Sequence, residues 1–454
     1  MRRFGNVVRA LDAESMLGIV GKFTNSACYL VSALLTTKFL TLPQQGFFFT
    51  LLSFATLTVV VELGLSTVII QFVSHELAGL ETAGDAINRA KALSRLRSIG
   101  RFAVIWFWTG ALLFWVVVGP SGYLFLRNVA GSSSVLPGPW TMMVTLVSLD
   151  LATFPCWAML EGARRIKSVY AYRAVKALVL GVGTWTALSF GLGLWALPIG
   201  FLCALPLALW PLRANWDFFT LLLTPPGREV VRWRAEILPL QWRLAMSWVA
   251  GYFANWAITP IALKMLGGAV AGQLGLTWTL ATGITTIASS VILVKFTRFG
   301  HLVATRQFPE LDRMVRRQGL ISVALAMAGS AVVLLLDWVA IREDIPFAHR
   351  LLPPGVVAIF MGGAIIQQCM LPLAYYLRAF KREPFMWLSI ATSMAQAAAI
   401  IVLGRLFGVV GFAIAYTGST IFLTVPGACL IFHYCRQKWT QAPVPQLHNE
   451  DSSR

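Results

Sequence analysis

Charged side chains are scarce in this sequence. Asp, Glu, Lys and Arg make up only 12% of the 454 residues, whereas they form roughly a quarter of a typical soluble protein. Hydrophobic residues account for 57%, and the mean hydropathy is +0.71. This composition excludes a water-soluble globular protein. The apolar length is sufficient for about twelve membrane-spanning helices, because one crossing takes about 20 residues.

Acidic residues are the rarer of the charged groups, with 19 Asp and Glu against 37 Lys and Arg and a net charge of +18. In a soluble chain this excess would suggest nucleic-acid binding. In a membrane protein, basic residues instead collect in cytoplasmic loops. If the N-terminus is inside, 29 of the 37 basic residues fall in segments expected on the cytoplasmic side. We therefore expect both termini in the cytoplasm and no nucleic-acid partner.

Residues that build catalytic or metal sites are also few. The five histidines lack metal-ligand spacing, the six cysteines form no CxxC pair, and no P-loop, GxSxG or HExxH motif occurs. The longest loop expected outside, at about 120–138, carries a single charge. The sequence therefore predicts no enzyme, no bound cofactor and no metal site.

Long apolar runs indicate an all-α integral membrane protein, because a membrane β-barrel would show short alternating segments instead. Twelve spans lie between the charged breaks. They cover residues 16–37, 47–73, 102–119, 139–160, 175–192, 194–212, 239–263, 269–294, 319–341, 355–377, 385–403 and 409–432. The inner segments 74–101, 213–238 and 295–318 mix charged and apolar residues, which is typical of short interfacial helices.

The two halves of the chain share a pattern at a constant offset of 226 residues. A lysine, a glycine and a histidine recur in this way, Lys38, Gly46 and His75 matching Lys264, Gly272 and His301. An offset near half the chain length predicts two six-helix lobes. We place the N-terminal lobe at 1–212, a cytoplasmic linker at 213–238 and the C-terminal lobe at 239–440. The polar tail 441–454 is expected to be disordered.

Basic residues inside apolar spans are candidates for function, because a charge in hydrocarbon is costly unless it meets water or a partner. Lys22 and Arg243 lie on polar stripes of the first and seventh helices. They are candidates to bind a phosphate-bearing anionic substrate, although salt bridges or snorkelling to the headgroups would also explain them. The candidates to line a cavity are Asn25, Ser26, Tyr29, Ser247, Asn255, Gln367 and Gln368.

Two carboxylates lie deep inside expected spans. Glu62 and Asp150 are candidates to couple transport to a proton or sodium gradient, although either could instead neutralise Lys22. A third acid, Asp337, lies near the outer end of its helix, where we expect it to be solvated.

Five stretches, in order along both halves, carry a family resemblance. They are Gln44–Glu76 (QQGFFFTLLSFATLTVVVELGLSTVIIQFVSHE), Leu240–Pro260 (LQWRLAMSWVAGYFANWAITP), Ala271–Leu280 (AGQLGLTWTL), Pro309–Met314 (PELDRM) and Tyr375–Phe385 (YYLRAFKREPF). These resemble bacterial Wzx-type polysaccharide flippases of the multidrug/oligosaccharidyl-lipid/polysaccharide (MOP) superfamily. The resemblance implies a MATE-like fold, with two lobes related by pseudo-twofold symmetry around a central cavity.

The resemblance also implies a function. A flippase of this kind moves undecaprenyl-diphosphate-linked oligosaccharide, a surface-polysaccharide precursor, from the cytoplasmic to the periplasmic leaflet of the bacterial inner membrane by alternating access. Lys22 and Arg243 would then bind the diphosphate, and a polysaccharide polymerase and glycosyltransferases would be expected as partners, together with membrane lipids. One departure concerns Phe47, Phe48 and Phe49, where the family has a tyrosine-rich turn, and it leaves the identity of the substrate open.

Three alternatives belong to other functional classes. A cation-coupled exporter of small molecules on the same fold would need an acidic cavity. A membrane enzyme of the same pathway would need a large periplasmic loop with polar catalytic residues, which this sequence lacks. A non-transporting scaffold of a polysaccharide synthesis complex would not depend on Lys22 or Arg243.

Overall fold

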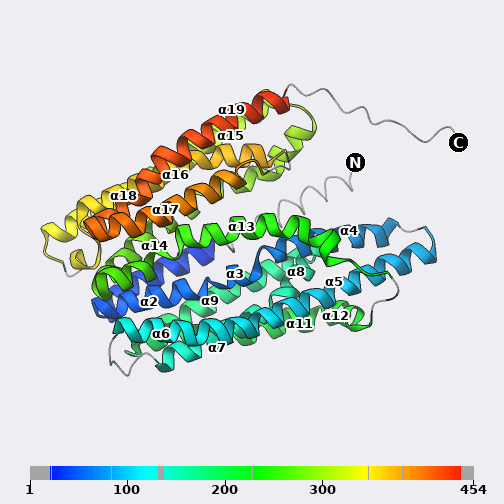
Figure 1. Cartoon of the computed structure of the whole chain (residues 1–454), viewed down its shortest axis with the longest axis horizontal. Helices are drawn as coiled ribbons and strands as arrows, with labels where there is room; N and C mark the ends of the chain where they lie inside the picture. Colours follow the sequence, from blue (N-terminus) through cyan, green and yellow to red (C-terminus); the bar gives the residue numbers. More distant parts are fainter. Residues whose placement is uncertain are drawn as a thin grey trace.

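The computed structural model describes residues 21, 23–82, 84–130, 137–225, 227, 229–345, 347–380 and 383–440. Lys22, the side chain of Arg243 and the tail 441–454 lie outside this description. The secondary structure of the described residues is helical throughout, and the helices form two bundles that lie side by side (Figure 1). The predicted all-α fold is therefore confirmed.

The N-terminal lobe contains the first six spans, several of which are built from more than one helical segment. In chain order they are the helix at 23–39; α2 (Leu42–Ala55), α3 (Thr58–Glu62) and α4 (Leu65–Thr82); α5 (Ala86–Leu113), η1 (Phe114–Val118) and α6 (Gly119–Ala130); α7 (Pro137–Ala152) and α8 (Phe154–Gly162); α9 (Ile166–Ser189); and η2 (Gly193–Trp195), α10 (Ala196–Ala204), η3 (Leu205–Ala208) and α11 (Leu209–Ala214). Local sequence sets the start of α2, where Thr41 and Gln44 form a capping box.

The C-terminal lobe contains the remaining spans. They are η4 (Trp233–Ile237) with α13 (Leu238–Asn255), α14 (Ile258–Ala304), α15 (Phe308–Arg342), η5 (Ala348–Arg350), α16 (Pro354–Arg378), α17 (Met386–Phe407), α18 (Val409–Ser419), η6 (Thr420–Thr424) and α19 (Val425–Thr440). The 47-residue α14 is broken at Gly267, whose φ of +86° is a conformation that glycine adopts without strain. The seventh span therefore ends at Gly267 and the eighth begins there.

Among the described residues, nine helices are long and apolar enough to cross a membrane, judged by length and composition. The stretch Leu244–Phe296 includes the break at Gly267 and so holds two crossings. The helix at 23–39 and α9 occupy the positions of the first and fifth predicted spans. Each of the twelve predicted spans therefore has a helical counterpart.

The prediction of separate interfacial helices is wrong for two of the three inner segments. Helices α4 and α5 run through 74–101, and α14 and α15 run through 295–318, meeting in short turns. Extending an existing helix costs less than nucleating a new one, which explains why these mixed segments continue their neighbours. Only the segment 213–238 contains a short separate helix of this kind, α12 (Trp216–Leu223).

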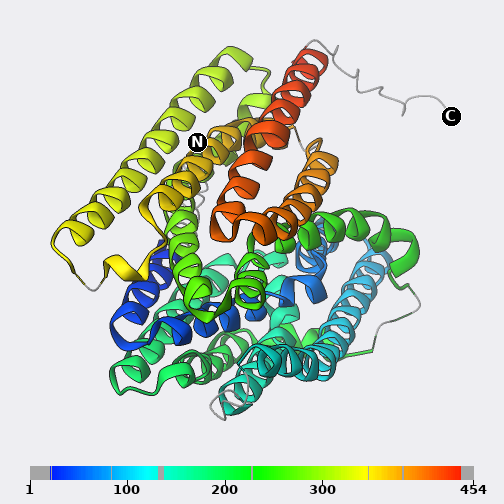
Figure 2. The ribbon, with the colours of Figure 1, turned by 60° about the vertical axis from the view of Figure 1, so that its left-hand side comes forward.

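The two lobes meet where α2 and α14 cross, at the left-hand end of the molecule in Figure 1, which Figure 2 turns toward the viewer. A Cβ on Gly46 would lie 2.1 Å from the Gly268 carbonyl oxygen, and a Cβ on Gly272 would lie 2.6 Å from the Leu42 carbonyl oxygen. Residues 42 and 268 are 226 positions apart, as are 46 and 272, so the contact is reciprocal. A local twofold axis therefore passes between Gly46 and Gly272, in agreement with the predicted repeat.

The first and seventh helices both lie at the seam between the lobes. Trp185 on α9 donates a hydrogen bond to Ser32 of the helix at 23–39 (2.8 Å), and on the other side Leu30 lies against Gly283 of α14. Helix α13 contacts α17 of its own lobe and α3 of the other (Figure 1). Both polar-striped helices are therefore placed where the lobes would move past each other.

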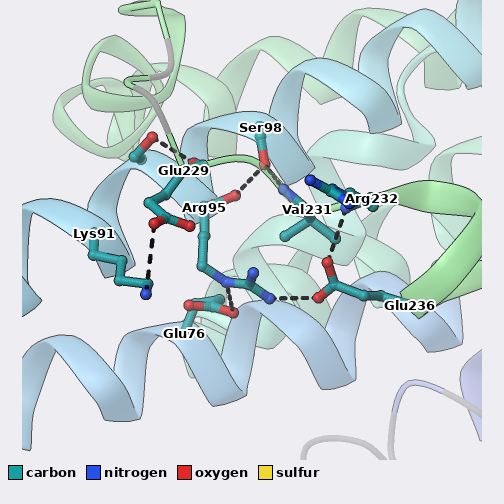
Figure 3. A network of polar contacts seen from close by, with 9 residues as sticks. Glu76, Lys91, Arg95, Ser98, Glu229, Val231, Arg232 and Glu236 are labelled. Atoms are coloured by element: carbon teal, nitrogen blue, oxygen red, sulfur yellow. Dashed lines mark hydrogen bonds and ion pairs between the residues drawn. The ribbon is translucent and has the colours of Figure 1, made fainter.

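The connector between the lobes is anchored on the N-terminal lobe (Figure 3). Arg95 on α5 pairs with Glu76 of α4 at 2.8 Å and with Glu236 of η4 at 2.6 Å. Partial burial alone would raise the pKa of Glu236, but hydrogen bonds from the Arg232 amide and the Arg95 guanidinium outweigh it, so this pKa lies below its ordinary value. The chain thus enters α13 from a fixed point on the other lobe.

Candidate functional site

Charged side chains gather on α9 and the helices around it. Arg173 Nη2 pairs with Glu161 at 2.8 Å, and Lys176 Nζ pairs with Asp150. Glu62 is a third carboxylate, and Arg173 is the charged residue that acts on it electrostatically. We call these five residues the N-lobe charge cluster.

Exposure differs strongly within the cluster. The side chains of Asp150 and Lys176 are 13% and 19% exposed, whereas that of Arg173 is 50% exposed. Separating the buried pair would leave an uncompensated charge, which keeps the two residues together. The Arg173 guanidinium carries five N–H donors and uses one on Glu161. Among the described residues no other hydrogen bond uses its remaining donors, so it can bind a further anion.

Glu62 lies beside a break in the second span. Leu63 and Gly64, which separate α3 from α4, have φ values of +50° and +69°. The carbonyl of Val61 accepts a hydrogen bond from the Trp106 indole at 3.3 Å. Interrupted helices inside membrane transporters expose backbone groups that bind substrates and ions. The buried Glu62 carboxyl is therefore next to the kind of backbone that ion coupling uses.

A small cavity of about 40 Å³ lies where the helix at 23–39 meets its neighbours. Asn25 and Tyr29 line it from that helix, and Thr279 of α14 lines it from the other lobe. Asp150 of the N-lobe charge cluster acts electrostatically on Tyr29. A cavity of this volume is large enough for ordered water and too small for an oligosaccharide. Ser26, between the two lining residues, is buried.

Ser247 and Asn255 are the two residues of α13 that were predicted to line a cavity, and neither is buried. Asn255 is exposed, and its amide donates to the Gly251 carbonyl within the same helix (2.9 Å). No atom lies within 4 Å of the position that a Cβ on Gly251 would take. Ser247, one turn earlier, is partly exposed. This part of α13 therefore leaves space at the seam.

Gln367 and Gln368, neighbours on α16, differ in burial. Gln367 is exposed, whereas Gln368 is buried and donates to the Ser322 hydroxyl at 2.5 Å inside the lobe. Asp337 on α15 is 1% exposed, and neither of its carboxylate oxygens has a hydrogen-bond partner among the described residues. The prediction that Asp337 is solvated is therefore wrong, because it lies on the face of α15 that the bundle buries.

Glu161, Arg173 and Lys176 are functional candidates that the sequence pattern did not single out. The pattern of charged breaks places Glu161 and Arg173 in a loop and Lys176 at the very start of the fifth span, whereas α9 already begins at Ile166. The sequence did contain a sign that the helix starts early, because no glycine or proline interrupts it between Ile166 and Leu180. The roles of Lys22 and Arg243 stay predictions. Within the described part of the chain, no group of three His, Cys, Asp or Glu residues is placed to hold a metal ion.

No protein-family model and no curated protein matches this sequence. Solved structures do match over nearly the whole chain. A multidrug resistance MATE family transporter of the MOP superfamily, in an inward-facing conformation, has a TM-score of 0.59 at 12% identity over 94% of both chains. The chain has the fold of the MOP-superfamily transporters.

Two further structures show the range of proteins that share this fold. The MATE multidrug transporter DinF-BH has a TM-score of 0.62 at 12% identity over 94% of this chain and 95% of its own. The lipid II flippase MurJ, in an inward closed conformation, has a TM-score of 0.58 at 12% identity over 94% of this chain and 89% of its own. At this identity the likeness establishes the fold of a multi-pass membrane protein and leaves the cargo open.

Proposed function

We propose that this chain is a flippase that moves undecaprenyl-diphosphate-linked oligosaccharide from the cytoplasmic to the periplasmic leaflet by alternating access of its lobes. The shared fold supports transport, and MurJ is a flippase on this fold. The resemblance of the five sequence stretches to Wzx-type flippases supports the oligosaccharide substrate. The proposal places the protein in the bacterial inner membrane with both termini cytoplasmic, beside the polymerase and glycosyltransferases of its pathway.

The observation that carries the proposal is the half-exposed guanidinium of Arg173. Arg173 lies on α9. The first helix packs against α9, because Gly21 lies close to the Tyr170 carbonyl oxygen and to Ala174. Guanidinium binds diphosphate oxygens in pairs, which makes arginine suitable for holding this group in a partly dry site. Lys176 adds a second positive charge one turn away.

The same cluster supports a coupling role for its acids. Glu62 is buried beside the helix break, and Asp150 is held by Lys176. Binding of a proton or a sodium ion at Glu62 would weaken the pull of this carboxylate on Arg173 and so change the affinity of Arg173 for the diphosphate. This gives ion binding and substrate binding one shared residue.

One observation favours a second candidate, a cation-coupled exporter of small molecules. The N-lobe charge cluster has three acids and two bases, so its described residues alone carry a net negative charge. Such a site attracts cationic cargo. Of the similar structures, DinF-BH is a multidrug transporter.

The test is leaflet-specific labelling of the lipid-linked oligosaccharide in a strain that lacks this protein and any redundant flippase. We expect the sugar to accumulate in the cytoplasmic leaflet and to be moved again on expression of the wild type. Arg173→Gln should reduce the transport rate about tenfold, the cost of one lost charge-assisted contact. Arg243→Ala should act in the same direction.

Arg164→Gln is the matched control, because Arg164 is an exposed arginine at the start of the same helix region, 4.0 Å from Glu81. It should restore transport fully. If the oligosaccharide reaches the periplasmic leaflet without the protein, the flippase proposal fails. If cells lacking the protein instead retain a cationic dye, the exporter becomes the better assignment. A scaffold would tolerate Arg173→Gln without loss of polymer export.

A further inference from the structure

A second, larger hollow lies on the C-terminal lobe, away from the seam. It is an open groove of about 760 Å³ between α15, α16 and α19. We call it the α15 groove and define it by Arg313, Arg316, Leu320, Val323, Leu373 and Arg436. In Figure 1 α15 and α19 are labelled along the edge of the upper bundle that lies farthest from the other lobe.

Charge and apolar surface are separated along the groove. Arg313 and Arg316 are exposed near the start of α15 and form no ion pair with any described residue. Leu320, one turn further, is 65% exposed, and Val323 follows on the same helix. At 1.5 Å per residue, Val323 lies about 10 Å along the helix from Arg316. A molecule that fits this groove needs an anionic head and an apolar tail of at least this length.

The third arginine of the groove is held in place. Arg436 on α19 pairs with Asp312 on α15 at 2.5 Å. Both residues line the groove, and their pair links the two helices there, while α15 and α19 otherwise make little contact. The groove therefore persists as a gap that the helices themselves leave unfilled.

The N-terminal lobe fills the corresponding gap with its own chain. There, α12 packs directly on α5, the third span of that lobe. A Cβ on Gly100 of α5 would lie 3.7 Å from Leu222 of α12 and 3.3 Å from Met159 of α8. In the C-terminal lobe no short helix among the described residues packs on the start of α15, where Arg313, Arg316 and Leu320 are exposed.

We propose that the α15 groove binds an anionic phospholipid of the surrounding bilayer, with its phosphate at Arg313 and Arg316 and an acyl chain along Leu320, Val323 and Leu373. Basic residues at headgroup depth attract anionic lipids by about 1 kcal/mol each, and the apolar wall continues from them into the depth of the hydrocarbon. The site would bind lipid whatever cargo the protein carries.

The test is native mass spectrometry of the purified full-length protein in detergent, titrated with phosphatidylglycerol or with phosphatidylcholine. We expect phosphatidylglycerol to be retained at one site and phosphatidylcholine to bind at least about tenfold more weakly there. The double variant Arg313→Gln/Arg316→Gln should lose this preference. Arg317→Gln is the matched control, because Arg317 is exposed on the same helix and does not line the groove.

Three results would overturn the proposal. The two lipids could bind the wild type equally, or the double variant could keep the preference, or Arg317→Gln could lose as much affinity as the double variant.

Undecaprenyl phosphate is the third probe. If it displaces phosphatidylglycerol from the wild type and binds more tightly, the groove is a binding site for an isoprenoid substrate, and the phospholipid proposal fails. Flippase activity is measured separately, so failure of one proposal leaves the other standing.

Discussion

The two lobes share a backbone plan but are held together internally by different chemistry. The N-terminal lobe joins α7, α8 and α9 through the ion pairs of the N-lobe charge cluster. The C-terminal lobe joins its helices through neutral groups, with Gln368 donating to Ser322 and Gln396 donating to the Ala254 carbonyl at 2.7 Å. Its described ion pairs lie outside this interior and are more exposed.

Pseudo-symmetry of the fold therefore does not extend to the chemistry. Charged groups respond to ions, substrates and pH, whereas amide and hydroxyl pairs do not titrate. Among the residues whose side chains the structure describes, we expect the charge-dependent steps of transport to depend on the N-terminal lobe, with Arg243 of α13 as the predicted charged contribution from the C-terminal lobe. The variants below test this contrast in decreasing order of the effect that we expect.

Breaking the buried ion pair should have the strongest effect. Lys176→Met and Asp150→Asn each leave one partner of the pair partly buried and alone, which costs about 3–5 kcal/mol of unfolding free energy. The double variant Asp150→Leu/Lys176→Met should recover most of that loss, because no lone charge is left. Denaturant unfolding of the purified protein measures both. Single variants that unfold like the wild type would mean that the pair is not buried as described.

Adding side-chain atoms where α2 and α14 cross should have the second-largest effect on stability. Gly46→Ala and Gly272→Ala each push a methyl group into the carbonyl oxygen of the opposite helix, and such overpacking costs about 1–3 kcal/mol. Both variants should be destabilised, with Gly46→Ala at least as costly as Gly272→Ala, because its methyl group would come closer to the opposing carbonyl oxygen (2.1 Å against 2.6 Å). Thermal unfolding of the purified protein is the measurement.

Gly362→Ala on α16 is the control for this prediction, because nothing lies within 4 Å of its Cβ position. It should be neutral or slightly stabilising, since alanine favours helices more than glycine does. A loss of stability at only one of Gly46 and Gly272 would contradict a local twofold axis at the crossing.

Removing an amide from the C-terminal lobe should cost less. Gln368→Leu deletes the hydrogen bond to Ser322, and hydrogen bonds between membrane helices contribute about 0.6 kcal/mol on average. Gln367→Leu, at the exposed neighbouring position, should be neutral. Transport should be unchanged in both variants. A large loss of transport with Gln368→Leu would assign a functional role to the C-terminal lobe and weaken the contrast between the lobes.

Removing the charge of Glu236 in the connector should have the smallest effect on stability, and this effect should depend on pH. Glu236 has a pKa below its ordinary value in the folded protein, so its ionised form stabilises the fold. That contribution is fully present above the unfolded pKa, about 4.3 for glutamate, and is lost as the pH falls through the lower folded value. Thermal unfolding of the wild type and Glu236→Gln should therefore differ at pH 7 and converge as the pH falls through the folded pKa of Glu236, which lies below the unfolded value. A difference that persists in acid would mean that packing, and not charge, holds the connector.

Much of the fold was predictable from the sequence because the membrane restricts it. Hydrocarbon forces every backbone polar group to pair within its own helix, so apolar run length alone predicts the number and the approximate positions of the spans. The offset of 226 residues predicted a two-lobe repeat, and the structure shows that Gly46 and Gly272, one matched pair of that repeat, meet where α2 crosses α14. Boundaries were less predictable, as at α9, because charged residues such as Arg173 continue a helix once a partner is available.

Hydropathy and local backbone chemistry were enough to determine the class of protein, its helices and the presence of a few costly charges inside them. Which of those charges meet was decided by the packing of the helices. Lys176 reaches Asp150 across 26 residues, and Asn25 and Tyr29 share a cavity with Thr279 from the other half of the chain. The energy of a buried charge depends on the distance to its partner. That distance is set by how the helices pack and not by the spacing of the two residues along the chain.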